Sequence, residues 1–413
     1  MSHRSRDPME LSNPELGPSP DRAGYVRLSA RVSYDDHAVP PESYWFELPE
    51  AYADSVTMTG EPWLACLLPL AARLGEPLRL PLPVDPALLD GATEVLHIWR
   101  SWFPGMSVVP IEVAERAPSP EGPARRVGAF FSGGVDAFFT VLRHEALGAA
   151  RPSARIDDLI TVWGFDIPLG EPAAFEALRG NLQRAATQLG KTFLDVATNF
   201  RTTRARLLDW RAVAHGPALA AVALLLEPRW RKVLVASSNP YTDLTPLGSH
   251  PMTDGLFSTS RMRIVHDGAG FSRMEKTRFL ADWPVALETL HVCWRVASAR
   301  NCGACAKCYR TMTALAVLGV LDRCTTFPPG AFDVRRVQDI WGPTPGTIAA
   351  LREIRPYAIA AGRHDIAQGL ARCVRRSERL MALTPTLRRI ANARFVWRVL
   401  PPIERFLYRG LIR

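Results

Sequence analysis

The sequence contains little lysine and no long apolar run. Only four of its 413 residues are lysine, so arginine supplies most of the positive charge. No stretch of eighteen or more consecutive apolar residues occurs, and the sequence therefore predicts no membrane-spanning helix. The first eight residues also lack the apolar core of a secretory signal. From these absences we expect a cytoplasmic protein.

The glycine turn Ser132-Gly133-Gly134-Val135-Asp136 matches neither of two common phosphate-binding motifs. It is not the Gly-x-x-x-x-Gly-Lys-Ser/Thr of Walker loops, nor the Gly-x-Gly-x-x-Gly of dinucleotide sites. The turn follows the apolar run 127–131 and precedes a helical pattern over 137–144. A strand, a glycine bend and a helix N-terminus in succession form a cradle for anions, because helical amides and the helix dipole favour negative charge there. We predict a phosphate site in which Asp136 faces a bridging metal ion or a polarised donor; a simple connecting turn is the alternative.

The length of 413 residues predicts two or three domains. Residues 1–22 are rich in proline, serine and aspartate, which predicts disorder, and the proline-containing stretch 117–123 indicates a linker. Between them we place an N-terminal α+β domain over 23–120, with strands over 25–34, 44–48, 78–83 and 108–113 and helices over 62–72 and 88–102. A central domain follows over 121–330, and a helical basic region over 331–413.

Strand and helix patterns alternate through the central domain. Apolar strands are predicted over 127–131, 159–165, 192–197, 232–236 and 262–265, and helices over 172–189, 216–226 and 273–280. Repeated strand–helix units predict an α/β fold with a doubly wound parallel sheet. Ligands of such sheets bind beyond the carboxyl ends of the strands. The glycine turn occupies one such end, and we expect other strand ends to converge on it, at Asp166, Asn199, Ser237, Ser238 and Asn239.

Four of the seven cysteines are regularly spaced. Cys293, Cys302, Cys305 and Cys308 follow the pattern Cys-x8-Cys-x2-Cys-x2-Cys. Short loops of this kind let four thiolates converge on one tetrahedral Zn2+, with Gly303 permitting the tight bend. A disulfide framework is disfavoured without a secretory signal, and an iron–sulfur cluster is the other alternative. Cys66, Cys324 and Cys373 are expected to be small buried apolar residues.

The net charge of +9 is concentrated near the C-terminus. Residues 373–413 contain ten arginines and two glutamates, which leaves about +1 for the rest of the chain. We predict helices here, with breaks at Pro385 and at Pro401-Pro402. The arginines suit an acidic partner, RNA or an anionic membrane surface, and a solvated helical cap is the alternative. The sequence also leaves open whether the protein forms a homodimer.

Together, the glycine turn and the cysteines resemble one family. Ser-Gly-Gly-x-Asp is similar to the pyrophosphatase loop of the N-type ATP pyrophosphatases, or PP-loop enzymes, which have an adenine-nucleotide α-hydrolase fold. The cysteine spacing after that domain is similar to that of the 7-cyano-7-deazaguanine synthases of queuosine biosynthesis. The resemblance covers roughly residues 125–320, with both motifs in the family's order.

This resemblance implies an ATP-dependent enzyme that adenylates a carboxylate, releases pyrophosphate and lets a nitrogen nucleophile displace AMP. The resulting amide would be dehydrated to a nitrile with a second ATP. It implies ATP, Mg2+ and Zn2+ as cofactors, with the glycine turn, residues 132–136, on the pyrophosphate. Asp166, Ser238 and Asn239 are further candidates to bind the nucleotide. Candidates to neutralise phosphate charge are Lys276, Arg261 and Arg263. His215 could meet another anionic group, and Asn239, Asp243, Ser249 and His250 would shape the substrate pocket, although each of these has a simpler capping or turn role available.

The chain departs from the family at Ala137, where the family has serine or threonine. A hydroxyl that could bond a phosphate oxygen is absent, while the backbone amides remain. Two alternatives to the adenylating enzyme therefore stay open. One is a PP-loop enzyme that modifies tRNA, and the other is a nucleotide-binding scaffold that has lost turnover.

Overall fold

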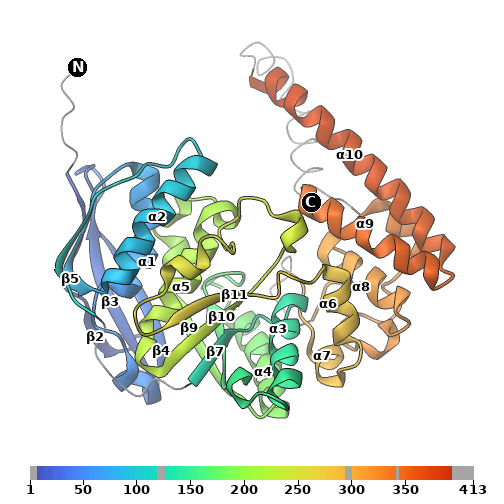
Figure 1. Ribbon diagram of the computed structural model, residues 1–413, viewed down its shortest axis with the longest axis horizontal. Helices are drawn as coiled ribbons and strands as arrows, with labels where there is room; N and C mark the ends of the chain where they lie inside the picture. The colour runs from blue at the N-terminus through green and yellow to red at the C-terminus, as the bar shows by residue number, and fades with distance from the viewer. Residues whose placement is uncertain (1–6, 119–125, 294–299, 341–343, 393–413) are drawn as a thin grey trace. The chain divides into compact units, whose positions relative to one another are not determined.

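The computed structural model describes residues 7–118, 126–293, 300–340 and 344–392 (Figure 1). The chain forms two compact units. Unit 1 comprises residues up to 238 together with 245–269, and unit 2 comprises 239–244 together with the chain from 270 onward. The boundaries predicted at 120 and 330 differ from this division, and most of the linker predicted over 117–123 lies outside the described residues.

Unit 1 is built on one large mixed sheet, so the predicted α/β class is confirmed. The sheet has eleven strands in the order β11-β10-β7-β8-β9-β4-β3-β1-β5-β6, with β2 paired to β3. Neighbours from β11 to β9 are parallel, as are β1, β5 and β6, and the pairs between β9 and β1 are antiparallel. The strands are β1 (Met9–Leu11), β2 (Glu15–Pro18), β3 (Tyr25–Ser33), β4 (Glu42–Pro49), β5 (Leu78–Val84), β6 (Ile111–Arg116), β7 (Arg126–Phe130), β8 (Asp158–Trp163), β9 (Thr192–Thr198), β10 (Trp230–Ala236) and β11 (Arg263–Asp267).

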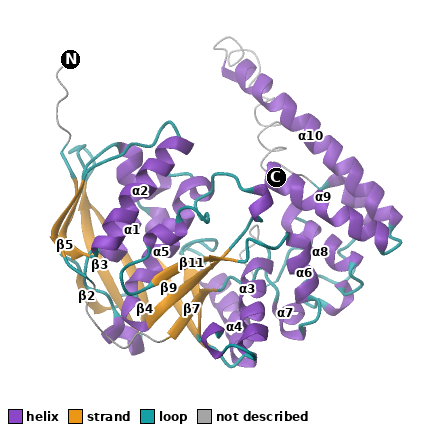
Figure 2. Cartoon of the chain, viewed as in Figure 1, coloured by secondary structure: helices purple, strands orange, loops and turns teal. Residues whose placement is uncertain are grey.

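Helices cover both faces of this sheet (Figure 2). One face carries α1 (Glu61–Leu74), α2 (Pro86–Trp102) and α5 (His215–Leu225), and the other carries α3 (Val135–Gly148) and α4 (Pro172–Gln188). Helix α1 packs on α5 and on β5, and every residue of α5 after the first is buried. The order of strands and helices is compatible with the doubly wound arrangement predicted from the alternating pattern.

The N-terminal region is part of this sheet and not a separate layer. Strand β4 pairs with β9 in antiparallel register, with Phe46 opposite Thr198. The prediction of disorder over residues 1–22 is wrong for β1 and β2, which add to the sheet beside β3. Met9 and Leu11 are fully buried there. The proline- and serine-rich composition of these residues is not typical of strands. The two short strands form because they pair with β3, which lies later in the chain.

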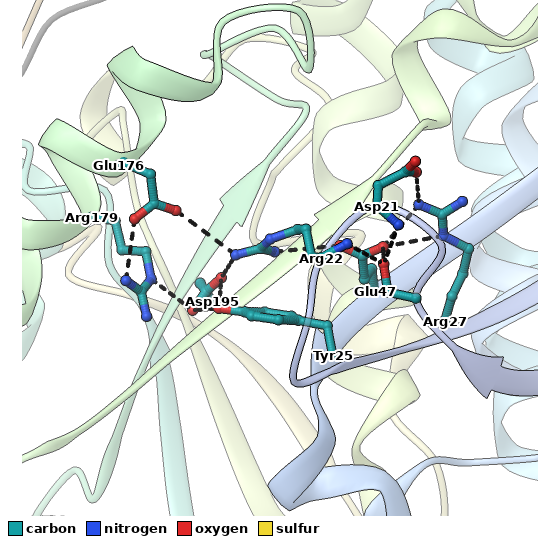
Figure 3. Close-up of polar contacts among 9 residues, drawn as sticks. Asp21, Arg22, Tyr25, Arg27, Glu47, Glu176, Arg179 and Asp195 are labelled. Atoms are coloured by element: carbon teal, nitrogen blue, oxygen red, sulfur yellow. Dashed lines mark hydrogen bonds and ion pairs between the residues drawn. The ribbon is translucent and has the colours of Figure 1, made fainter.

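A buried charge network joins the N-terminal strands to β9 and α4 (Figure 3). Asp195 on β9 accepts hydrogen bonds from Arg22 at 2.9 Å, from the Tyr25 hydroxyl at 3.1 Å and from Arg179 of α4 at 3.1 Å. The Arg22 guanidinium lies 3.5 Å from the centre of the Tyr25 ring and 3.5 Å from the carboxylate of Glu47 on β4. Both carboxylates are nearly inaccessible to water, so these partners compensate for their burial.

A second buried carboxylate ties together the amino ends of three strands. Asp158 at the start of β8 accepts hydrogen bonds from Arg126 Nε of β7 at 3.0 Å, from Arg229 Nε at 2.7 Å and from Trp230 Nε1 of β10 at 2.7 Å. Burial alone would raise the pKa of Asp158, but these hydrogen bonds outweigh it and hold the pKa below its usual value. The order β10-β7-β8 is therefore fixed by side chains as well as by backbone pairing.

Within its described residues, unit 2 is helical. It contains α6 (Arg273–Leu280), α7 (Pro284–Thr289), α8 (Ala306–Val317), α9 (Pro345–Ala360) and α10 (His364–Asn392). The helices predicted for the C-terminal region are confirmed over α9 and α10, which pack on each other. The break predicted at Pro385 is wrong, because α10 continues to Asn392; a proline removes one helical hydrogen bond and does not always end the helix. The pair Pro401-Pro402 lies outside the described residues.

None of the helices in the described ranges combines the length and the apolar character needed to cross a bilayer.

Replacing Asp158 with asparagine should destabilise the protein by about 3–5 kcal/mol, because two arginines lose their shared carboxylate. The matched control is Asp90→Asn on the exposed side of α2, for which we expect a change within about 0.5 kcal/mol. Since the pKa of Asp158 is lowered by folding, its contribution is complete above about pH 4 and is lost as the pH falls further. Urea unfolding of both variants between neutral and acidic pH measures this. Equal stability of the wild type and Asp158→Asn at neutral pH would contradict the assignment.

Candidate functional site

The glycine turn has the strand–turn–helix geometry expected from the sequence. Strand β7 ends at Phe130 and α3 begins at Val135. Gly133 has a φ of 73°, a left-handed conformation that residues other than glycine rarely adopt. Gly134 is the N-cap of α3 in an extended conformation, and it offers no side chain to accept hydrogen bonds from the first helical amides. These amides are oriented as in anion-binding helix N-termini.

Buried groups of the neighbouring strand fix the start of this turn. The Phe131 amide donates to the Ile160 carbonyl at 2.7 Å, and the Thr161 hydroxyl donates to the Phe131 carbonyl at 2.6 Å. Phe131 and Thr161 are buried, whereas Ser132 is exposed. The chain therefore reaches the surface at Ser132, at the carboxyl end of β7, while Gly133 is buried again and Gly134 is half-buried. Sequence reasoning missed Thr161, which stands inside a predicted strand and has no motif around it.

The helix that follows the turn is held against the edge strand β11. The Thr140 hydroxyl donates to Asp267 at 2.9 Å, Arg143 forms an ion pair with the same carboxylate, and His144 Nε2 lies 3.1 Å from it. Burial would raise the pKa of Asp267, but the hydrogen bond from His144 and the charge of Arg143 outweigh it and lower the pKa. This contact fixes the direction in which the N-terminus of α3 points.

The glycine turn lies where the strand order reverses. From β7 the chain proceeds outward to β8 and β9, and then returns to the other side of β7 for β10 and β11. In open α/β sheets, ligand crevices occur at the carboxyl ends of the strands at such a reversal. Asp166 follows β8 and Ser238 follows β10, and both residues are exposed. Because these strands are parallel to β7, the structure brings the turn, Asp166 and Ser238 to the same edge of the sheet.

Arg261 and Arg263 are not at that edge in the backbone register, and their predicted role toward the phosphates stays a prediction. Arg263 is the first residue of β11 and pairs with Lys232, which in turn pairs with Val127 near the start of β7. At about 3.3 Å per residue, Arg263 is about 16 Å along the strand direction from the turn. The sequence pattern placed the fifth strand correctly, but a residue preceding a parallel strand belongs to the amino edge.

Asn239, Asp243 and Lys276 belong to unit 2. Lys276 is in α6 and is 1% exposed. Asn239 and Asp243 lie in the short unit 2 segment 239–244, close to Gly346 at the start of α9. Their predicted roles toward the nucleotide stay predictions.

Ser249 and His250 take part in a buried polar cluster of unit 1. The Ser249 hydroxyl donates to Asp254 at 2.7 Å, the His250 amide donates to it at 3.0 Å, and His266 Nδ1 lies 2.7 Å from it. Burial, and then the neighbouring His266, lower the pKa of His250. These contacts give Ser249 and His250 the turn role that was the simpler alternative.

His215 is the first residue of α5. The next residue, Gly216, lies so close to the Gly248 carbonyl that a Cβ on Gly216 would be only 2.0 Å from that oxygen.

The four spaced cysteines converge in unit 2. The sulfur atoms of Cys293, Cys302, Cys305 and Cys308, the cysteine cluster, all lie within 4.8 Å of one another. The Cys302 and Cys308 sulfurs are 3.8 Å apart, and none of the cysteines forms a disulfide. Four sulfurs at 2.3 Å from a tetrahedral ion lie about 3.8 Å from one another. The cluster therefore fits a metal ion such as zinc.

Backbone geometry holds the two Cys-x2-Cys turns in shape. The amides of Ala304 and Cys305 donate to Cys302 Sγ at 3.4 and 3.3 Å, and the Cys308 amide donates to Cys305 Sγ at 3.5 Å. Gly303 has a φ of 64°, and a Cβ there would meet Ala331 at 2.8 Å. The role predicted for Gly303 is thus supported both by its conformation and by close packing.

Asn301 joins the two ends of the cluster. Its side-chain oxygen accepts from the Val292 and Cys293 amides at 2.8 and 3.1 Å, and its nitrogen donates to the Leu290 carbonyl at 2.9 Å. Asn301 is 1% exposed. It therefore fixes the distant Cys293 beside Cys302, a second layer of support that metal sites commonly need. Its position directly before Cys302 is the one sequence signal that could have pointed to it.

The cluster also favours thiolate formation. The hydrogen bond from the Cys308 thiol lowers the pKa of Cys305 to about 5, while the same interaction raises the pKa of Cys308. Thiolates are the form that binds metal, so the lowered pKa of Cys305 suits a metal ligand. The other cysteines, Cys66, Cys324 and Cys373, are buried as predicted, and burial raises the pKa of each.

Comparisons with family models, with curated proteins and with solved structures found no match for this chain.

The purified protein should contain one zinc ion per chain, and Cys305→Ser should lose it together with the stability of unit 2. Structural zinc sites contribute on the order of 10 kcal/mol to folding, so a marked fall in Tm is expected. The control is Cys324→Ala, a buried thiol of the same unit outside the cluster, which should retain the metal. Elemental analysis and thermal unfolding measure both. Iron with the visible absorbance of an iron–sulfur cluster, or a metal-free wild type, would contradict the zinc assignment.

Proposed function

We propose that the protein is an ATP-dependent enzyme that adenylates a carboxylate and transfers the acyl group to a nitrogen nucleophile. The observation that carries the proposal is the glycine turn at the carboxyl end of β7, beside the reversal of the strand order. Strands β7 to β11 form a parallel block with this turn after its first strand, which supports the adenine-nucleotide α-hydrolase-like fold implied by the resemblance. The cysteine cluster follows the sheet in the chain, as in the 7-cyano-7-deazaguanine synthases that the motifs resemble, and is the second support.

In this reaction a carboxylate oxygen of the substrate attacks the α-phosphorus of ATP. The bond from that phosphorus to the bridging oxygen breaks and pyrophosphate leaves. The nitrogen nucleophile then attacks the acyl carbon of the acyl-adenylate, AMP leaves with the electrons of the carbon–oxygen bond, and the nitrogen loses a proton. Ser132 and the amides that follow Gly133 and Gly134 would hold the pyrophosphate, and Asp136 would ligate Mg2+, which supplies charge neutralisation.

Ala137 favours a second candidate function, a nucleotide-binding protein without turnover. Ala137 is buried in the first turn of α3, where the family has a hydroxyl. The amides of the turn suffice for binding phosphate, whereas turnover also requires charge that develops on the leaving group to be stabilised. The two candidates therefore share the binding step and differ in pyrophosphate release.

Pyrophosphate release from ATP across a panel of small carboxylates should be detectable and should fall by roughly tenfold or more in Asp136→Asn, because a metal-binding carboxylate is lost. The matched control is Glu94→Gln on the exposed side of α2, which should leave release unchanged. ATP binding without release for any carboxylate would favour the binding protein. Unchanged release in Asp136→Asn would show that the turn is not the catalytic loop.

Alanine substitutions at the two glycines of the turn should have different effects. Gly133→Ala forces a left-handed conformation and should cost about 1–2 kcal/mol of stability, together with ATP affinity. Gly134, with φ of −76° and ψ of 167°, tolerates a side chain, so Gly134→Ala should keep the stability and weaken only ATP binding through its methyl group. Thermal unfolding and ATP titration separate the two effects. Full ATP affinity in Gly134→Ala would contradict close approach of phosphate to this residue.

A further inference from the structure

Helix α10 carries a line of exposed arginines. Arg372, Arg375 and Arg379, here called the arginine face, are all exposed and follow one another at intervals of three and four residues. At 1.5 Å rise per residue, neighbouring members are about 4.5 and 6 Å apart along the helix axis. Residues at these spacings lie on the same side of a helix. The arginine face is therefore a straight row of positive charge.

The opposite side of α10 fixes the orientation of this row. Ile366, Leu370, Cys373 and Ser377 recur at helical spacing and are fully buried. Helix α10 packs through this side on α9 and on the short helical segment Val334–Asp339. Burial of one complete side leaves the arginine face toward solvent, where it cannot rotate away without exposing the apolar row.

The arginine face differs from the other arginines around it. Arg352 forms an ion pair with Glu378, Arg363 pairs with Asp365 at 3.0 Å, and Arg376 lies 3.6 Å from Asp339. In the described part of the chain, no ion pair involves a member of the arginine face. Glu378, Asp365 and Asp339 are therefore already paired with other arginines, and the row keeps three positive charges within about two helical turns.

A row of guanidinium groups at this spacing matches a polyphosphate chain better than a membrane. Arginine binds phosphate oxygens through two parallel N–H groups, and a nucleic-acid strand offers phosphates at regular short intervals along its length. A helix that binds a bilayer inserts an apolar side, but the apolar side of α10 is already covered.

The packing of α10 also favours contact with a phosphate backbone over the reading of bases. Helix α9 and the segment Val334–Asp339 cover the apolar side of α10, so the arginine face and its exposed neighbours are what remains to meet a nucleic acid. Contacts from arginine to phosphate position a protein on the strand without reading its sequence. Contact by shape and backbone, without base reading, is the mode by which RNA helices are recognised.

We propose that the arginine face of α10 binds the phosphate backbone of RNA. It is an interaction surface of unit 2 that does not depend on the nucleotide site of unit 1. Arg372, Arg375 and Arg379 would each contact one phosphate, and binding would show little preference for base sequence.

Fluorescence anisotropy of a labelled RNA hairpin with the full-length protein tests the proposal. The triple variant Arg372→Gln/Arg375→Gln/Arg379→Gln keeps good helix formers and should bind RNA about tenfold more weakly at moderate salt. Each lost phosphate contact should reduce the slope of log affinity against log salt by roughly 0.7–0.9, hence by about two in total. Helical content by circular dichroism should remain unchanged.

The matched control removes three positive charges that are already paired, in Arg335→Gln/Arg352→Gln/Arg363→Gln. RNA affinity in this control should change less than threefold or so, because these groups are partly neutralised by their own carboxylates. Equal losses in the two triple variants, or no loss in the first, would overturn the proposal. Tighter binding of a DNA duplex than of RNA, or arginine-face-dependent binding only to vesicles of phosphatidylglycerol, would overturn it as well.

Discussion

The buried carboxylate of Asp158 is the interaction on which the arrangement of unit 1 depends. It joins the amino ends of β7, β8 and β10 through Arg126, Arg229 and Trp230, so the strand on each side of β7 is specified by a charged side chain. A carboxylate without water is tolerated only when its partners are all in place. Separating β8 from β7 and β10 would remove Asp158 from these partners, so the buried carboxylate favours the order that reverses at β7.

The position of the candidate site follows from that order. Because β10 and β8 flank β7, the carboxyl end of β7 lies at the reversal, where a parallel sheet leaves room for a ligand. Thr161 holds the last buried carbonyl before the turn, and Asp267 holds the helix after it. The turn is thus supported at both ends by buried hydrogen bonds. Preorganised amides of this kind can bind phosphate without rearranging.

Unit 2 depends on a different chemistry, the convergence of thiols. The amides of the Cys-x2-Cys turns and the side chain of Asn301 bring the four sulfurs to distances that suit one metal ion. Farther along the chain, α9 and α10 cover their apolar sides against each other and leave the arginine face outside. The two units therefore carry separate candidate surfaces for anions, a turn of amides in one and a row of guanidinium groups in the other.

The sequence by itself determined the elements with strong local signals. The alternating strands and helices of residues 126–280, the glycine turn and the cysteine spacing were all predicted, because periodicity and short motifs act over a few residues. Tertiary structure alone decided which elements meet. It joined β1 and β2 to the main sheet, placed Arg263 at the edge away from the turn, and brought Asn301 between Cys293 and Cys302. Strand partners and edges are set by long-range hydrogen bonds and buried charges, which leave no periodic trace in the chain.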